Sequence, residues 1–117
     1  MGYVSVELVK ALAQIKCDDI GFDTENAFNN FISELIEYAS SLIDDYCGRS
    51  FSEPTPQTVK LVAALIVVNM LHAILQRKIN PTVQATNIAV KIIEGEAFTD
   101  DLKMLLNPYR VLRVERG

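Results

Sequence analysis

The chain contains a single histidine, His72, so a catalytic device that needs an imidazole base would have to use this residue. His72 follows Asn69 by three positions and precedes Gln76 by four, and this spacing places the three side chains on one stripe of a helix. No constellation of nucleophile, base and orienting acid surrounds the histidine in the sequence. We therefore interpret His72 as a hydrogen-bonded side chain at a packing surface rather than as a catalytic base.

Residues that could hold a metal ion are also poorly arranged. The aspartate pairs at positions 44–45 and 100–101 are adjacent in sequence, and adjacent side chains on a helix point about 100° apart, so neither pair converges on one ion. Cys17 and Cys47 lie in different segments without a CxxC spacing, and we expect both to be reduced, partly buried thiols. Glycine-rich phosphate loops, HExxH and EF-hand spacings are missing. The sequence predicts a protein that is not an enzyme and has no metal or cofactor.

Composition predicts one folded domain over residues 1–117. Half of the residues are hydrophobic and 22% are charged, which is typical of a globular core. The net charge of −4 provides no basic surface for wrapping nucleic acid. The N-terminal segment has no apolar signal core, and the apolar run 61–75 is shorter than the roughly 18 residues of a spanning helix. We therefore expect a soluble, unsecreted protein without a membrane partner.

Hydrophobic periodicity and capping residues predict the helices. Ser5 caps a first helix that ends near Lys16, with positions 8, 11, 12 and 15 on its apolar face. A long amphipathic helix begins at Asp23 or Thr24 and ends before Gly48, which suits the left-handed position after a helix. A third, apolar helix begins at residues 55–56 and runs to about residue 79.

The rest of the chain is less regular. Residues 82–94 fit either a helical stripe or a strand followed by a turn, and we slightly favour extended structure. Thr99 caps a last helix with an apolar face at residues 102, 105, 106 and 109, which ends near Asn107 ahead of Pro108. The fold predicted is all-α: a small bundle of about four helices with a short irregular or β-like insertion and an extended C-terminal tail.

The apolar character of the third helix on every side indicates assembly, because a chain of 117 residues is expected to cover only one side of it. We expect Asn69, His72 and Gln76 at or near a boundary between protomers. Arg49 is also a candidate interface residue, which we expect to pair with a carboxylate and to orient the turn 50–53. An acidic face of the long helix could line a lumen and let DNA slide past; it consists of Glu34, Glu37, Asp44 and Asp45.

The C-terminal residues alternate between basic and apolar side chains. We expect residues 109–117 to form a docking tail that orders against another chain, with its arginines facing acidic side chains rather than DNA. The candidate docking residues are Arg110, Val111, Leu112, Arg113, Val114 and Arg116. A frayed, solvated terminus is the alternative interpretation.

Two short patterns give the chain a resemblance to a known family. The first is A-x-x-x-I-D-x-Y-x-G-R-x-F, carried by Ala39, Ile43, Asp44, Tyr46, Gly48, Arg49 and Phe51; the second is L-x-P-Y-R, carried by Leu106, Pro108, Tyr109 and Arg110. With the order of the helices, they make the chain from about residue 5 to residue 110 resemble the head–tail connector (adaptor) proteins of tailed phages and related proviruses.

The resemblance implies a non-enzymatic virion protein of the phage neck, made in the host cytoplasm. Such proteins form a ring of about a dozen copies that joins the portal protein to the next neck or tail protein and continues the DNA channel without binding DNA specifically. Two other classes stay open: a small helical DNA-binding or regulatory protein, which needs a basic recognition helix, and an enzyme or ligand-binding bundle, which needs convergent polar groups in a pocket.

Overall fold

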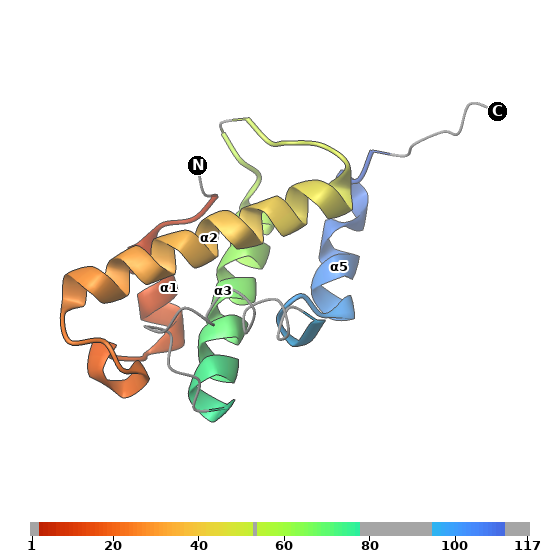
Figure 1. Ribbon diagram of the computed structural model, residues 1–117. Helices are drawn as coiled ribbons and strands as arrows, with labels where there is room; N and C mark the ends of the chain where they lie inside the picture. The colour runs from red at the N-terminus through yellow and green to blue at the C-terminus, as the bar shows by residue number, and fades with distance from the viewer. Residues whose placement is uncertain (1–2, 53, 78–94, 112–117) are drawn as a thin grey trace.

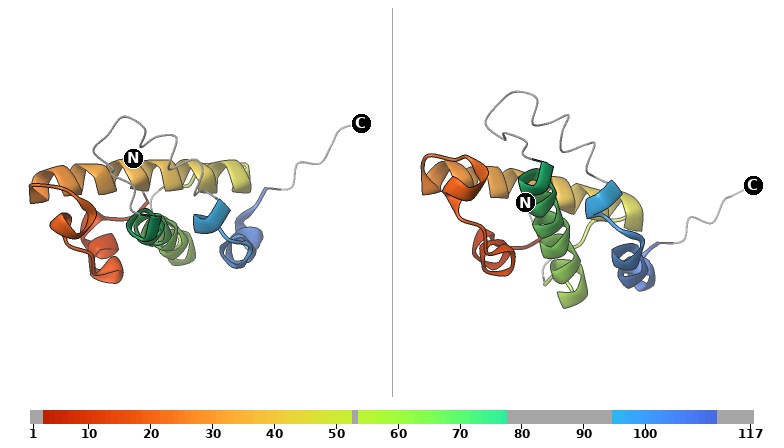
Figure 2. Two further views of the ribbon diagram at one scale, coloured as in Figure 1. Left: turned by 60° about the horizontal axis from the view of Figure 1, so that its bottom comes forward. Right: turned by 90° about the horizontal axis from the view of Figure 1, so that it is seen from below.

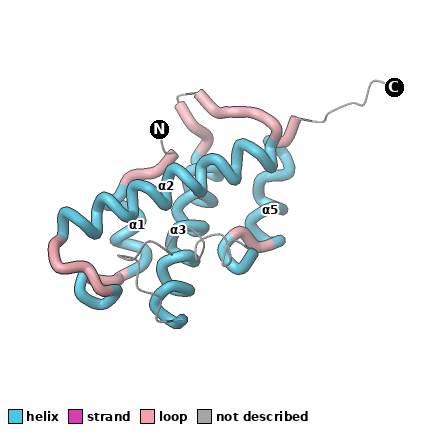
Figure 3. Tube along the Cα trace, viewed as in Figure 1, coloured by secondary structure: helices cyan, strands magenta, loops and turns pink. Residues whose placement is uncertain are grey.

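The computed structural model describes residues 3–52, 54–77 and 95–111, and over these residues it consists of helices and loops without a strand (Figures 1 and 3). In chain order the elements are α1 (Val6–Ala13), the 3-10 helix η1 (Cys17–Ile20), α2 (Glu25–Cys47), α3 (Gln57–Arg77), α5 (Asp100–Leu106) and the 3-10 helix η2 (Asn107–Tyr109). The predicted all-α class is confirmed. The expected extended segment 82–94 lies outside the described residues; residues 95–97, just after it, are helical.

The helices form two layers. The long helix α2 crosses over α1, α3 and α5, which lie side by side on one of its faces (Figure 1). The view from below in Figure 2 shows α3 in the middle of this lower layer, with α1 on one side and α5 on the other. Helix α3 packs against all three of its neighbours. Helices α1 and α5 therefore lie near opposite ends of α2.

Helix α1 begins where the sequence predicted and ends earlier. The Ser5 hydroxyl accepts a hydrogen bond from the Leu8 N–H at 3.2 Å, as expected of an N-cap. The last helical residue is Ala13 rather than a residue near Lys16, because Gln14 adopts a left-handed conformation with φ of 55°. A left-handed residue reverses the chain after a helix, and its N–H satisfies one of the last free carbonyl groups.

The predicted apolar face of α1 was wrong. Val9 and Ala13 are the buried side chains of this helix, whereas Leu8 and Leu12 remain 41% and 43% exposed. Lys10 determines the orientation, because its ammonium group contacts Glu25 and Asn29 on α2. Leu8 and Leu12 lie two positions before and after Lys10, about 160° around the helix from it, so they face away from α2.

Helix α2 was predicted well. The Thr24 hydroxyl accepts a hydrogen bond from the Ala27 N–H at 3.1 Å, and Gly48 ends the helix in a left-handed conformation with φ of 70°. One face of the helix is buried against the lower layer; it comprises Phe28, Phe31, Ile32, Leu35, Ile36, Ala39, Ser40, Ile43 and Cys47. The amphipathic pattern was reliable here because the helix covers only one layer of the bundle.

Helix α3 is covered by its own chain on more sides than the sequence suggested. Its buried residues are Val59, Val62, Ala63, Ala64, Ile66, Val67, Val68, Met70, Leu71, Ala73 and Ile74. The prediction that one chain can cover only one side of this helix is wrong, because α1, α2 and α5 leave a single stripe open. Leu61, His72 and Leu75 are exposed on that stripe and Leu65 is half-buried. By length and composition α3 could cross a membrane, but 61% of the relevant stretch is buried in the bundle, as in the core helix of a folded domain.

Helix α5 closes the other end of the bundle. The Thr99 hydroxyl accepts a hydrogen bond from the Leu102 N–H at 3.4 Å, which confirms the predicted cap. Leu102 and Leu106 are buried, whereas Leu105, expected on the same face, is 45% exposed. The helix ends at Leu106, and Pro108 lies in the 3-10 turn that follows.

Candidate functional site

The two patterns that carry the family resemblance, about 60 residues apart in sequence, meet in space at the C-terminal end of α2. We call this contact the junction and define it by the patterns themselves, residues 39–51 and 106–110, together with Tyr3. Ala39, Ile43 and Leu106 have no exposed surface and form its base. The remaining residues of both patterns surround this base with aromatic rings, hydroxyl groups and guanidinium groups.

Tyr3 links the start of the chain to the junction. Its phenol donates a hydrogen bond to the Asp44 carboxylate and accepts one from the Phe51 N–H at 3.0 Å. Its own N–H donates to the hydroxyl of the buried Ser40 at 3.1 Å. Burial, followed by the hydrogen bond to Asp44, raises the pKa of the Tyr3 phenol, because both favour the neutral form. The segment before α1 is thereby fixed against the end of α2.

Tyr46 joins the two patterns directly. Its hydroxyl donates a hydrogen bond to Asn107 Oδ1 at 2.7 Å, and its ring meets the edge of Phe98 with centroids 5.7 Å apart. The Arg110 guanidinium lies 4.6 Å from the centre of the same ring, and Arg110 Nε donates to the Tyr46 carbonyl at 3.2 Å. Tyr46 therefore holds the chain that leaves α5 against the end of α2.

Phe51 is the second aromatic centre of the junction. Its ring makes edge-to-face contacts with Tyr3 and Tyr109, at centroid distances of 5.8 and 6.2 Å. The Arg49 guanidinium lies over the ring at 4.5 Å. The sequence predicted a carboxylate partner for Arg49, and the contact that the structure shows is instead this cation–π contact within the chain. Because the Arg49 residue is exposed, the face of the guanidinium away from Phe51 meets solvent.

The C-terminal segment begins at the junction. The Val111 N–H donates to the Cys47 carbonyl at 2.8 Å, which satisfies one of the free carbonyl groups at the end of α2. Tyr109, Arg110 and Val111 therefore contact their own chain, whereas the sequence predicted that docking to another chain begins at residue 109. The other predicted docking residues lie outside the described residues: Leu112, Arg113, Val114 and Arg116.

The predicted acidic face is smaller than expected. Glu34, Glu37 and Asp45 are exposed on the side of α2 away from the lower layer. Asp44 is half-buried and accepts the Tyr3 hydrogen bond, so it belongs to the junction and not to this open face. Adjacent helical positions point about 100° apart, which accounts for the different surroundings of Asp44 and Asp45.

Two side chains of the predicted polar stripe of α3 contact backbone carbonyl groups of neighbouring segments. Asn69 is half-buried and donates to the Ala97 carbonyl at 3.0 Å, whereas His72 Nε2 lies 3.2 Å from the Ala13 carbonyl at the end of α1. Gln76 is exposed. The three side chains do not converge on a common point. The same two helices, α1 and α3, also carry exposed leucines. We call the leucine face the set Leu8, Leu12, Leu61 and Leu75, which are exposed, with the half-buried Leu65.

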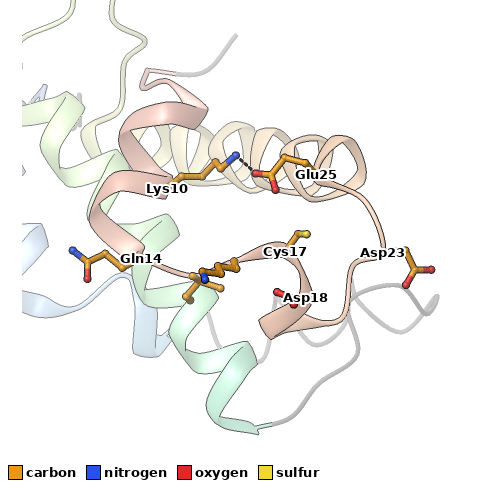
Figure 4. Close-up of a pocket in the computed structure, with 8 residues that line it drawn as sticks. Lys10, Gln14, Cys17, Asp18, Asp23 and Glu25 are labelled. Carbon is orange, nitrogen blue, oxygen red and sulfur yellow. Dashed lines mark hydrogen bonds and ion pairs between the residues drawn. The ribbon is translucent and has the colours of Figure 1, made fainter.

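An open cleft of about 650 Å³ lies at the other end of α2, between α1, η1 and the start of α2 (Figure 4). Lys10 forms an ion pair with Glu25 across it, and Asp18, Asp23 and Cys17 lie nearby. The Cys17 and Cys47 thiols are free, and burial is the first cause that raises the pKa of each, so both stay protonated at neutral pH. The sequence did not predict this cleft, because its residues come from three segments: the end of the first predicted helix, the loop that follows it and the start of the long helix.

Comparisons of the chain with protein-family models, with curated proteins and with solved structures found no match.

The sequence did contain a signal for the junction: each of the two patterns carries a tyrosine and an arginine, groups that stack on one another. Nothing in a single sequence, however, indicates that the two patterns touch.

Proposed function

We propose that this protein is a structural, non-enzymatic component of a phage-type virion that assembles into a ring of about a dozen copies at the neck. The ring joins the portal protein to the next neck or tail protein and continues the channel through which DNA passes. The proposal rests on the resemblance carried by the two patterns. The observation that supports it best is the leucine face, on a bundle whose core is already filled.

The leucine face exposes apolar surface that contact with another protein would bury. Leu8, Leu12 and Leu61 are each more than two-fifths exposed. Single exposed leucines are common on soluble proteins, but four exposed leucines and the half-buried Leu65 on two helices that pack together favour a protein–protein contact. Asn69, His72 and Gln76 lie on the same helix as Leu61, Leu65 and Leu75, and we expect them near the boundary between protomers. The exposed carboxylates of Glu34, Glu37 and Asp45, on the opposite side of the molecule, would repel passing DNA.

The test is to compare assembly of the wild-type protein with that of Leu12→Glu and Leu61→Glu. Ser33→Glu is the matched control, because it adds the same charge on the exposed side of α2. We expect rings with a central hole in negative-stain micrographs of concentrated protein, or of protein mixed with a phage portal protein. The two leucine variants should remain monomeric in native mass spectrometry, and Ser33→Glu should assemble like the wild type.

The alternative is a small helical DNA-binding or regulatory protein, and the same preparation separates the two. A connector ring should leave a labelled duplex unshifted at low salt, where electrostatic binding is strongest. A shifted duplex together with a protein that stays monomeric in the presence of the portal protein would contradict the proposed function.

A further inference from the structure

We infer that the cleft between α1, η1 and α2 receives the basic C-terminal segment, residues 112–116, of a second copy of this chain. The inference rests on the proposed ring and deepens it, because it specifies which parts of two neighbouring copies touch. It starts from the charges around the cleft, the position at which the C-terminal segment leaves the body, and the length of α2.

The cleft offers carboxylates beside an apolar wall. Lys10 and Lys16 also line the cleft. The Lys10 ammonium group contacts both Glu25 and Asn29, so the carboxylates of Asp18 and Asp23 outnumber the remaining cation, Lys16, by one. Asp18 lies in η1, and Asp23 lies on the segment that leads from η1 into α2, with its carboxylate pointing outward in Figure 4. The buried Ile15 contributes apolar surface. A suitable occupant therefore carries guanidinium or ammonium groups and also has apolar side chains.

The C-terminal segment has this composition. Arg113 and Arg116 provide two guanidinium groups, and Leu112 and Val114 alternate with them, against a single carboxylate at Glu115. Arginine pairs with carboxylates through directed, charge-assisted hydrogen bonds, so a cleft bordered by aspartates suits it better than it suits an apolar peptide.

The chain cannot fill its own cleft with these residues. The segment leaves the body at Val111, which is bonded to Cys47 at one end of α2, whereas the cleft lies beside Glu25 at the other end. The 23 residues of α2 separate these ends by about 33 Å. Arg116 lies five residues beyond Val111, a distance of at most about 18 Å even for an extended chain. The occupant must therefore come from another molecule.

The contact is directional. Each copy uses its C-terminal segment at one end and its cleft at the other, so the interface joins two different surfaces rather than a surface with itself. A head-to-tail contact of this kind closes into a ring when its rotation allows closure, and otherwise grows as a filament. It is compatible with the leucine face, which lies between the two ends along the lower layer.

Cys17 provides a native reporter inside the cleft. The variant Val114→Cys places a thiol in the C-terminal segment, and Cys47 is fully buried and so does not compete. A short bismaleimide, added at pH 8.5 or above because the pKa of the Cys17 thiol is raised, should link successive copies into a ladder of dimers, trimers and longer chains on denaturing gels. The ladder should collapse to at most a dimer in the double variant Cys17→Ser/Val114→Cys, where only two tail thiols can join.

Charge reversal supplies the second measurement, made on the Val114→Cys background. We expect D18K/D23K and R113E/R116E each to reduce the ladder at least tenfold, and an equal mixture of the two proteins to restore it. The mixture recovers because the reversed segment of one copy fits the reversed cleft of the other. E34K/E37K, which changes two exposed acids outside the cleft, should leave the ladder unchanged; circular dichroism checks that every variant is folded.

The outcomes of the inference and of the proposed function are separable. Rings in micrographs without a ladder would refute this contact and leave the proposed function standing. Cross-links from position 114 to the portal protein in place of Cys17 would also refute the contact. A ladder that survives Cys17→Ser, or a mixture that fails to recover, would overturn it as well. A ladder without rings or portal binding would support the contact and count against the proposed function.

Discussion

Replacing Tyr3 with phenylalanine should destabilise the junction by about 2 kcal/mol. The substitution keeps the ring that packs on Phe51 and removes only the hydroxyl, which donates to the Asp44 carboxylate and accepts from the Phe51 N–H. A hydrogen bond to a charged group contributes about 1.5–3 kcal/mol and a neutral one about 0.5–1.5. The Tyr3 and Asp44 side chains are both half-buried, so water can replace part of the lost hydrogen bonding. The lower end of the summed range, about 2 kcal/mol, therefore applies.

Urea unfolding followed by circular dichroism measures this effect. With a slope of about 2 kcal/mol per molar urea, the midpoint of Tyr3→Phe should fall by about 1 M at unchanged slope. Tyr109→Phe is the matched control, because it removes a hydroxyl from the tyrosine whose ring packs against the same Phe51, and its midpoint should move far less. A double-mutant cycle with Asp44→Asn should show coupling of at least 1 kcal/mol between Tyr3 and Asp44.

The pH dependence of the stability difference between wild type and Tyr3→Phe provides an independent test. The pKa of Tyr3 is raised in the folded protein, so its contribution is fully present below the unfolded value of about 10 and is lost as the pH rises toward the folded value. The stability difference between wild type and Tyr3→Phe should therefore be constant from pH 7 to 9 and should shrink above about pH 10. Equal midpoints at pH 7, or a difference that grows above pH 10, would refute the assignment of the hydrogen bond.

Three further predictions concern the junction. Gly48→Ala forces a left-handed conformation on a residue with a Cβ atom and should reduce the free energy of unfolding by about 1 kcal/mol, measured by urea unfolding; an unchanged value would contradict the φ of 70°. Tyr46→Phe removes the hydroxyl that donates to Asn107 and should cost about 1 kcal/mol, with Asn107→Ala adding little to the double variant if the two side chains act as one pair. Arg49→Ala loses the contact over Phe51 at an exposed position and should cost about 0.5–1 kcal/mol, whereas Arg49→Lys should keep part of it; a loss of several kcal/mol would indicate the ion pair that the sequence predicted.

The helix boundaries were predictable because they depend on local chemistry. Ser5, Thr24 and Thr99 each accept a hydrogen bond from an N–H three residues later, and Gly48 has the left-handed conformation expected after a helix. These interactions are made within a few residues of sequence, so a single chain shows them. The end of α1 at Ala13 was not predicted, because the residue that follows it in a left-handed conformation is a glutamine, Gln14, rather than a glycine.

The surfaces were less predictable because they depend on which helices become neighbours. Leu8 and Leu12 fit an apolar stripe in the sequence, yet the contact of Lys10 with α2 turns Val9 inward and both leucines outward. The number of helices that cover α3 was underestimated for the same reason. Periodicity identifies an apolar face and does not say which partner covers it.

The junction also sets a geometric condition on assembly. Val111 is bonded to Cys47 and Arg110 is stacked on Tyr46, so the C-terminal segment leaves the body at a fixed point relative to the last turn of α2. The cleft is bordered by Glu25, in the first turn of the same helix. The length of α2 therefore determines the distance between the two ends of each copy that the inferred contact would join. A stiff helix between these ends transmits one spacing to every neighbour, and a repeated spacing with a fixed rotation is what a closed ring requires.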